Sequence, residues 1–328
     1  MLIDSPIALR TDLHQHLWPP ELIAALRARS SPPHLEGDGE RPLLRMRHEP
    51  GGQVALGGHA LERRLAALDA SGIDRTVMSL STPLGIEALP EMESLELIGA
   101  YHDGIARLVD ESGGRLTAWA APPLRADDGG AAVVSAAIDR GFVGASVPSE
   151  ALASPDALDA VAPLLAMLER RGRPLFVHPG PAPDTEPYAL DHGMPVWWPN
   201  LGVYPGLSVR AFFAWRAIGA PRFRNLRVCF AIMAGAAPFL EERWRVFSGE
   251  TRTIDRNLFL DTASCGRLAL ECAMATYGVE QIVFGTDMPV ISSQPVTAAL
   301  TGLGPAAFEA VTERNPLRLL DTRDLETP

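Results

Sequence analysis

The chain has 328 residues, of which 47% are hydrophobic and 21% charged, a globular composition long enough for one large α/β barrel or two mid-sized domains. Its formal net charge of −11 disfavours nucleic acid or an anionic membrane as a partner. All 29 basic residues are arginine, which excludes enzymes that need a lysine amine: Schiff-base enzymes, pyridoxal-phosphate enzymes and P-loop NTPases.

Three further features predict a cytoplasmic protein that acts on a small molecule. The first residues, MLIDSPIALRTD, lack the basic-then-apolar pattern of a signal peptide. The longest apolar run, at 228–240, is too short to span a bilayer and contains proline and glycine. The three cysteines, Cys229, Cys265 and Cys272, form no CxxC pair, as expected in a reducing compartment.

Eight short apolar runs recur along the chain and predict β-strands. They cover residues 8–14, 75–81, 116–122, 142–148, 174–179, 226–232, 258–263 and 282–287. Stretches with amphipathic helical spacing lie between them, at 59–71, 91–112, 156–171 and 237–247. This alternation predicts an α/β fold, a (β/α)8 TIM barrel formed as a single domain by residues 1–328. A doubly wound sheet has less support, because no GxGxxG motif follows a strand.

Two long irregular stretches interrupt the pattern, an insert at 30–58 and a segment at 181–206. Loops of this length in a compact domain are usually functional, so we expect both on the active face. We interpret 181–206 as a lid in which Trp197, Trp198 and Tyr204 contact substrate and His192 reaches the site. The alternative is that its aromatic residues pack against neighbouring helices or a second subunit.

Polar side chains close three of the predicted strands. His14 and His16 alternate at the end of the first strand and therefore point to one face, His178 ends the fifth, and Asp287 ends the eighth. The carboxyl ends of barrel strands form the active face, so these groups predict a site for Zn²⁺ or a similar first-row ion with an open coordination position. The alternatives are hydrogen-bonded histidines lining the barrel, and an Asp287 that caps a helix.

Motifs along nearly the whole chain resemble the amidohydrolase superfamily (amidohydrolase family 2), in particular the branch that contains aminocarboxymuconate-semialdehyde decarboxylase and γ-resorcylate decarboxylase. These motifs are DLHQHLWP, LDASGIDRTVMS, GFVGASV, LFVHPG, APFLEERW, LDTA, VFGTDMP and ERNPLRLL. The resemblance implies that His14, His16 and His178 bind metal and that Asp287 is a ligand or transfers a proton. Members with two ions bridge them through a lysine on strand 4. Because this chain has no lysine, we expect one divalent ion, zinc first, with manganese and iron as alternatives. Relatives are commonly dimers, which also makes a homodimer an expectation.

One position departs from this branch. Its members usually carry a histidine at the end of strand 6, within a segment like AHxGGGxP, whereas this chain reads FAIMAGAAP and places Ile232 there. Isoleucine can neither polarise a substrate nor activate water. Either Asp287 alone handles the proton, or His192 substitutes from the lid, or the activity has changed.

Three functions remain open from the sequence. The leading hypothesis is a mononuclear metal-dependent hydrolase of a small amide, lactone or C–C bond, in which Asp287 takes the proton from water and His178 belongs to the catalytic centre. The second is a metal-dependent non-oxidative decarboxylase of an aromatic or unsaturated acid, in which Asp287 protonates the carbon that loses CO₂. The third is a metal-free or non-catalytic barrel that binds a small molecule, an idea that Ile232 motivates. Asp261, which closes the seventh strand, is expected to be a structural hydrogen-bonding carboxylate, with a contact to a metal ligand or to substrate as the alternative.

Overall fold

The computed structural model of the protein describes residues 9–188, 193–195, 197–251 and 255–320. Eight parallel strands form one sheet, with each strand beside the next along the chain. Their bounds are Thr11–His16 (β1), Arg75–Ser79 (β4), Leu116–Ala120 (β5), Gly144–Pro148 (β6), Leu175–His178 (β7), Val228–Phe230 (β8), Leu258–Asp261 (β9) and Ile282–Val283 (β10). The backbone N–H groups of Leu13 and His16 donate to the carbonyls of Phe284 and Met288, at 2.9 and 2.7 Å, so β1 meets the segment that follows β10. These bonds close the predicted (β/α)8 barrel.

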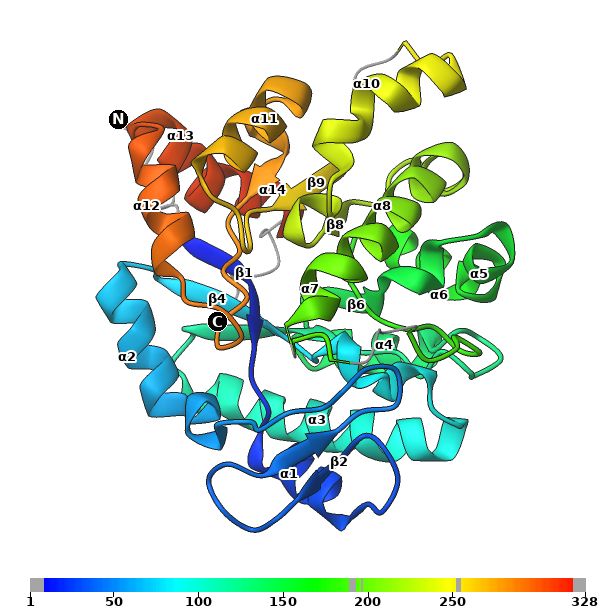
Figure 1. Cartoon of the computed structure of the whole chain (residues 1–328), viewed down its shortest axis with the longest axis vertical. Helices are drawn as coiled ribbons and strands as arrows, with labels where there is room; N and C mark the ends of the chain where they lie inside the picture. Colours follow the sequence, from blue (N-terminus) through cyan, green and yellow to red (C-terminus); the bar gives the residue numbers. More distant parts are fainter. Residues whose placement is uncertain (1–8, 189–192, 196, 252–254, 321–328) are drawn as a thin grey trace.

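Helices surround the strands, as Figure 1 shows. They are α1 (Pro20–Ala28), α2 (Leu61–Ser71), α3 (Glu91–Glu111), α4 (Ala131–Asp139), α5 (Pro155–Ala160), α6 (Ala162–Arg170), α7 (Trp198–Gly202), α8 (Tyr204–Ala214), α9 (Ala220–Arg222), α10 (Ala237–Ser248), α11 (Arg267–Tyr277), α12 (Gln294–Gly302), α13 (Pro305–Glu309) and α14 (Asn315–Leu320). Across the described ranges, no helix combines the length and apolar character needed to cross a membrane.

The interior of the barrel is filled by apolar side chains from successive strands. Trp119 stacks on Phe176 with ring centroids 5.5 Å apart, and its indole N–H donates to the carbonyl of Leu13 at 3.0 Å. Cys229 and Phe259 belong to the same buried cluster. The ring of His14 contacts the edge of Phe176, with centroids 5.1 Å apart, so this cluster forms the floor on which the polar strand ends rest.

The first strand ends at His16, as the alternation of His14 and His16 predicted. The apolar run covers 8–14, whereas β1 runs from Thr11 to His16. Its register against β4 shifts between Asp12 and Gln15, as at a β-bulge. A bulge changes the local direction of side chains, which the apolar pattern alone does not reveal.

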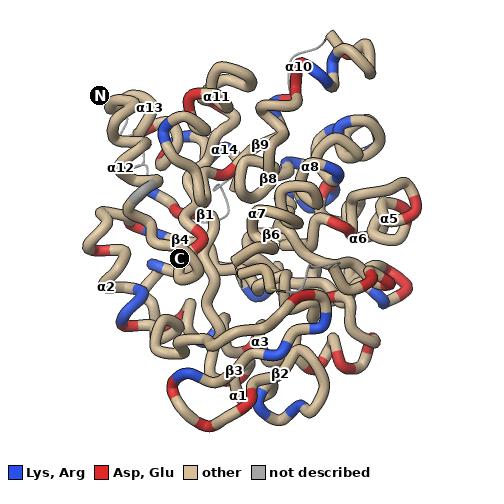
Figure 2. The backbone as a smooth tube through the Cα atoms, in the orientation of Figure 1, with Lys and Arg blue, Asp and Glu red and all other residues tan. Residues whose placement is uncertain are grey.

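Both long inserts lie partly in regular structure. Within 30–58, β2 (His34–Glu36) and β3 (Leu43–Arg45) pair as an antiparallel hairpin. Within 181–206, α7 and the first residues of α8 are helical. His192 lies outside the described residues. In the view of Figure 2, acidic and basic residues are interspersed over the outer elements.

Candidate metal centre

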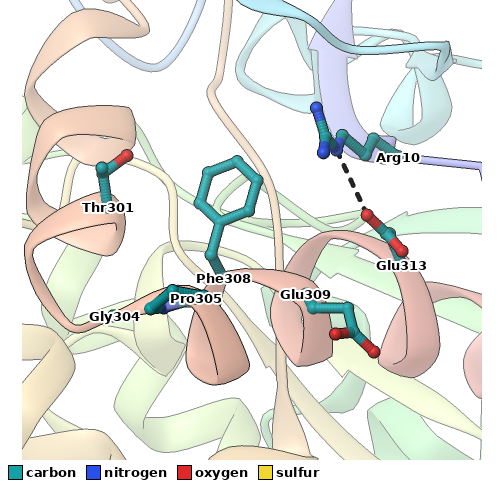
Figure 3. A pocket seen from close by; sticks show the side chains of 7 residues that line it. All are labelled: Arg10, Thr301, Gly304, Pro305, Phe308, Glu309 and Glu313. Carbon is teal, nitrogen blue, oxygen red and sulfur yellow. Dashed lines mark hydrogen bonds and ion pairs between the residues drawn. The ribbon is translucent and has the colours of Figure 1, made fainter.

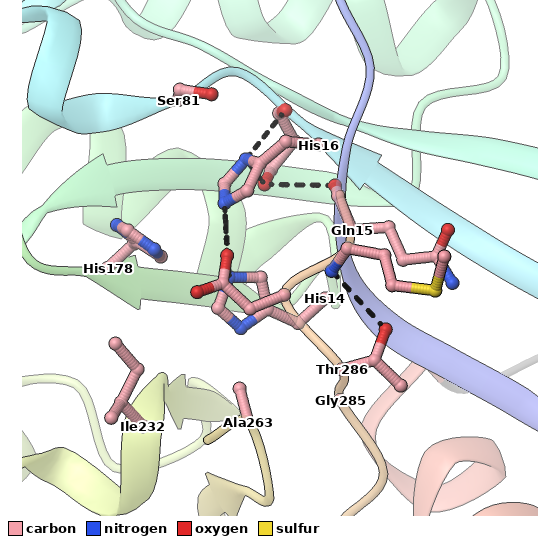
Figure 4. Close-up of polar contacts among 12 residues, drawn as sticks. His14, Gln15, His16, Ser81, His178, Ile232, Ala263, Gly285 and Thr286 are labelled. Carbon is pink, nitrogen blue, oxygen red and sulfur yellow. Dashed lines mark hydrogen bonds and ion pairs between the residues drawn. The ribbon is translucent and has the colours of Figure 1, made fainter. Parts of the chain in front are cut away.

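Four buried side chains converge at the carboxyl ends of the strands. His14 and His16 come from β1, His178 from β7, and Asp287 from the segment after β10. One nitrogen or oxygen of each lies within 4.8 Å of the corresponding atoms of the others. Figure 4 shows the three imidazoles around a common centre. The structure therefore brings together the residues that the sequence predicted as ligands.

The orientation of His14 is set by Asp261, the last residue of β9. The Nδ1 atom of His14 lies 2.7 Å from Oδ2 of Asp261, and both side chains are fully buried. A carboxylate accepts hydrogen bonds only, so Nδ1 carries the proton and the lone pair of Nε2 faces the centre. Asp261 is thus a hydrogen-bonding carboxylate, as the sequence predicted, and its partner is a candidate ligand whose tautomer it fixes, which matches the alternative reading as a support of the site.

The other two histidines are held in the same way. Nδ1 of His16 lies 3.2 Å from the carbonyl of Ser79, and Nδ1 of His178 lies 2.9 Å from the carbonyl of Pro179. The hydroxyl of Thr82 lies 2.7 Å from both Nδ1 of His178 and that same carbonyl. Each ring therefore donates from Nδ1 and presents the lone pair of Nε2 to the centre.

The separations between these atoms suit a shared cation. The two Nε2 atoms of His14 and His16 are 3.2 Å apart, and they lie 3.4 and 3.0 Å from Oδ1 of Asp287. Two ligands bound at about 2.1 Å, at tetrahedral to octahedral angles, would be roughly 3.0–3.4 Å from each other. Lone pairs this close repel unless a positive charge lies between them. The buried group therefore fits one divalent metal ion.

The pKa shifts of the candidate ligands also indicate that this centre stabilises a positive charge. Burial lowers the pKa of His14, but the charges of Asp261 and Asp287 outweigh burial and raise this pKa to about 10. Burial raises the pKa of Asp287, yet His14 and His16 hold it below its ordinary range. Burial, together with the neighbouring histidines, lowers the pKa of His178. Two carboxylates thus stabilise a cation here, whether a proton or a metal ion.

The turn after β8 has an unusual backbone. Ile232, Met233 and Ala234 have φ values of 54°, 52° and 50°. The left-handed region costs an L-residue about 1–2 kcal/mol, and for a β-branched residue it is an outlier. The backbone N–H of Ile232 donates to Oδ1 of Asp261 at 2.7 Å, and its side chain packs on the barrel-interior cluster. The turn therefore supports Asp261 through its backbone and presents an apolar side chain beside the histidines (Figure 4).

The loop that carries Asp287 is also constrained. Asp287 itself has a φ of 62°, and its N–H donates to the carbonyl of His14 at 2.8 Å. A Cβ added at Gly285 would lie 2.8 Å from Cβ of His14 and 3.0 Å from the carboxyl carbon of Asp261. Only glycine fits this close approach without moving two residues of the centre. The adjacent Thr286 hydroxyl donates to buried Asp12 at 2.6 Å.

The predicted substrate-binding aromatics differ in exposure. Trp197 is 53% exposed, Trp198 is half-buried, and Tyr204 is only 7% exposed. The hydroxyl of Tyr204 donates to Glu49, a residue that the sequence did not single out, as it did not single out Ser79 or Thr82. No motif marks these partners, since ordinary polar residues become informative only when the barrel closes.

A separate cavity of about 420 Å³ lies away from the centre (Figure 3). Arg10, which lines it, directly precedes β1 and forms an ion pair with Glu313 at 3.2 Å. The cavity therefore lies at the amino ends of the strands, whereas His16 lies at the carboxyl end. In TIM barrels the amino-terminal face contributes to stability rather than to chemistry.

Solved structures with the same fold include several decarboxylases. The 5-carboxyvanillate decarboxylase LigW from Sphingomonas paucimobilis is 19% identical, with 96% of this chain and 99% of that chain covered and a TM-score of 0.73. The 2,6-dihydroxybenzoate decarboxylase from Rhizobium is 18% identical, with 96% and 99% covered and a TM-score of 0.69. The 5-carboxyvanillate decarboxylase from Novosphingobium aromaticivorans, complexed with manganese and 4-hydroxy-3-methoxy-5-nitrobenzoic acid, is 18% identical, with 96% of each chain covered and a TM-score of 0.71. At these identities the likeness establishes the fold.

No curated protein sequence matches this chain. The model of one protein family, described as amidohydrolase, does match it, over residues 11–322. The matched region includes all four converging ligand candidates and every strand of the barrel. The expectation from the sequence motifs is thereby confirmed: this chain belongs to the amidohydrolase family of enzymes.

Proposed function

We propose that this protein is a metal-dependent decarboxylase that removes CO₂ from an aromatic or unsaturated carboxylic acid without oxidation. The observation that carries the proposal is the convergence of three imidazole nitrogens and one carboxylate oxygen beside an apolar wall. The sequence alone favoured hydrolysis. The similarity to 5-carboxyvanillate and 2,6-dihydroxybenzoate decarboxylases instead supports decarboxylation.

The residues that would hold the ion are His14, His16, His178 and Asp287. When bound, a divalent ion supplies the positive charge that anchors the substrate's carboxylate and a neighbouring oxygen. Imidazole and carboxylate ligands suit zinc, manganese and iron. Zinc is the expectation from the ligand types, and manganese is supported by its presence in a similar decarboxylase. Elemental analysis of protein purified without chelator distinguishes them.

Within the chain, Asp287 is the acid of the proposed reaction. Because His14 and His16 keep Asp287 ionised in the resting centre, it would first take a proton from solvent. It would then deliver this proton to the carbon from which CO₂ departs, and the electron pair of the broken C–C bond forms the new C–H bond. Ile232 and Ala263 offer methyl groups beside the centre (Figure 4) and exclude water. Because the substrate's carboxylate becomes neutral CO₂, weakly polar surroundings favour the product side of the step.

Hydrolysis would make a different demand on the same residues. It needs one group to take a proton from water and another to assist the carbonyl or the leaving group. The side chain at the strand-8 turn, Ile232, provides neither function. A reaction with one proton donor and no attacking water is therefore the better match to this centre.

The test compares CO₂ with hydrolysis products. The chain is loaded with Zn²⁺ or Mn²⁺ and incubated with hydroxybenzoates and unsaturated acids, and separately with lactones and amides. We expect CO₂, and a loss of about 10²–10⁴-fold in rate for Asp287→Asn at matched metal content. Asp139→Asn, at an exposed carboxylate on α4, serves as the control. Hydrolysis without CO₂, or full activity of the metal-loaded Asp287 variant, would refute the proposal.

A further inference from the structure

Three polar side chains from different parts of the chain meet near the rim of the barrel. Tyr204, the first residue of α8, donates its hydroxyl to Oε1 of Glu49 at 2.5 Å. Tyr188 binds the same insert through its backbone, since its N–H donates to the carbonyl of His48 at 2.9 Å. Its hydroxyl oxygen is buried and has no hydrogen-bond partner among the described residues. A buried hydroxyl without a partner is costly, and it is expected where a ligand completes the hydrogen bonding.

Backbone packing places this cluster beside the metal centre. A Cβ at Gly235, which ends the turn that begins at Ile232, would lie 2.4 Å from the carbonyl oxygen of Pro205. The start of α8 therefore lies directly on the turn that supports Asp261. A Cβ at Gly85 would lie 3.3 Å from both His48 and Pro181. The insert that carries Glu49 therefore lies close to the segment that follows His178.

The charges that act on the two hydroxyls are acidic. Burial raises the pKa of Tyr188 above its ordinary value, and the charges of Glu150 and Glu49 raise it further. Burial also raises the pKa of Tyr204, again with Glu49 and with a contribution from Asp287. Arg210 pairs with Glu150 at 3.6 Å, so the charge of Glu150 is partly offset. A second carboxylate on a substrate would meet the like charge of Glu49 at this end of the site.

We propose that Glu49, Tyr188 and Tyr204 form a distal recognition site that selects acids bearing a hydroxyl or amino substituent away from the reacting carboxylate. The inference rests on the proposed function, because the metal centre holds the carboxylate and so directs the opposite end of the molecule toward the cluster. The Tyr204 hydroxyl donates its proton to Oε1 of Glu49. Oη of Tyr204 and Oε2 of Glu49 therefore remain available as hydrogen-bond acceptors. The Tyr188 hydroxyl can also accept. A substituent that donates hydrogen bonds satisfies all three, whereas a methoxy or carboxylate group pairs at most with the O–H of Tyr188 and leaves the acceptors on Tyr204 and Glu49 unpaired.

Equilibrium binding tests this selection without requiring turnover. Isothermal titration of the zinc-loaded chain uses probes that share the 2-hydroxybenzoate core and differ at position 4 or 5: hydroxy, amino, methoxy and carboxy. We expect the hydroxy and amino probes to bind about 10–100-fold more tightly than the methoxy and carboxy probes, as for one hydrogen bond to a charged group. Equal affinity across the series would overturn the proposal.

Two variants assign the selectivity to the cluster. Glu49→Gln places an amide N–H₂ where the free oxygen was, because the amide oxygen still accepts from Tyr204, so the preference for donor probes should vanish or reverse. Tyr188→Phe removes a hydroxyl without a partner in the described structure, so it should fold normally. Because this hydroxyl can also donate to a methoxy or carboxy oxygen, the preference for donor probes should fall less than in Glu49→Gln. The control is Tyr277→Phe, since Tyr277 forms a similar pair with Glu241 at 3.0 Å between α11 and α10. Unchanged ratios in both cluster variants would overturn the assignment.

The same samples separate this inference from the proposed function. Release of CO₂ is recorded in parallel with binding. Selective binding that depends on Glu49, without CO₂ from any probe, refutes decarboxylation but supports the recognition site. Release of CO₂ with no discrimination among substituents refutes the recognition site and leaves decarboxylation intact.

Discussion

Replacement of Asp261 by asparagine should reverse the tautomer of His14. Oδ1 of Asp261 accepts from the backbone N–H groups of Ile232 and Ala263 at 2.7 and 3.0 Å, whereas Oδ2 faces Nδ1 of His14. Two backbone donors fix the amide oxygen of the asparagine at the Oδ1 position. The amide N–H₂ then faces His14, whose Nδ1 must accept. The ring proton moves to Nε2 and points into the centre, where a metal needs a lone pair.

The expected effect is large for an isosteric change. Partners that orient a metal-binding histidine typically contribute 10–100-fold in metal affinity, which is about 1.4–2.8 kcal/mol. We expect a loss at or above the upper end of that range for Asp261→Asn, because the ring presents the wrong atom rather than merely losing support. The folded chain also loses a buried charge-assisted hydrogen bond, worth about 1.5–3 kcal/mol.

The measurement is zinc affinity by competition with a chromophoric chelator, together with the histidine tautomer from long-range ¹H–¹⁵N spectra. The matched control is Asp12→Asn, which also removes a buried carboxylate. Asp12 accepts from Gln15 and Thr286 and contacts the backbone but not the ring of His14. This control should lower stability and leave the tautomer unchanged. If Asp261→Asn binds zinc as tightly as the parent chain, the tautomer argument is wrong.

Two further predictions concern the rest of the fold. Within the described ranges, both carboxyl oxygens of Glu87 are buried without a hydrogen-bond partner. Burial raises the pKa of Glu87 from 4.5 to about 8. The folded chain therefore holds an additional proton between these values, and its stability falls as pH rises through that window. In urea unfolding, the free energy of unfolding of Glu87→Gln relative to the parent chain should therefore rise by about 3.5 kcal/mol between pH 5 and pH 8. A difference that does not change with pH would contradict burial as the cause. Alanine at Trp197 and Trp198 should raise KM or change substrate preference at constant metal content; loss of metal together with activity would show that they support the fold instead.

The sequence predicted the barrel because its strands are buried on both faces. Each of the eight apolar runs contains one of the eight strands or overlaps it, since a barrel strand packs outward on helices and inward on the core and has no polar side to interrupt the pattern. The boundaries of the individual helices and strands were less predictable. The residues 156–171 form α5 and α6 rather than one helix, with a break at Val161. The register shift of β1 against β4, between Asp12 and Gln15, is revealed only by the pairing of the two strands.

The ligand residues were predictable for a related reason, and their partners were not. Strand ends of a closed barrel meet at one face, so the polar residues His14, His178 and Asp287 could be assigned to one site from the strand pattern alone. The partner Thr82 begins a single 3₁₀ turn, Thr82–Leu84, whose position no strand pattern dictates. The pair of Glu49 and Tyr204 joins an insert to a helix 155 residues later in the chain, a contact between segments whose approach the sequence does not encode in any local pattern.

Ile232 has a side chain without acid–base groups and a backbone in the unfavourable left-handed region. Its side chain gives the centre no proton donor, yet its backbone keeps a left-handed conformation and donates to Asp261. A turn retained at a cost of about 1–2 kcal/mol per residue implies that the backbone contact is needed even though the side chain is inert. That contact fixes Asp261, Asp261 fixes His14, and His14 presents its lone pair to the centre. The turn therefore maintains the metal centre while its own side chain adds no acid–base group, which leaves Asp287 as the candidate proton donor among the described residues. This combination suits the proposed decarboxylation better than hydrolysis.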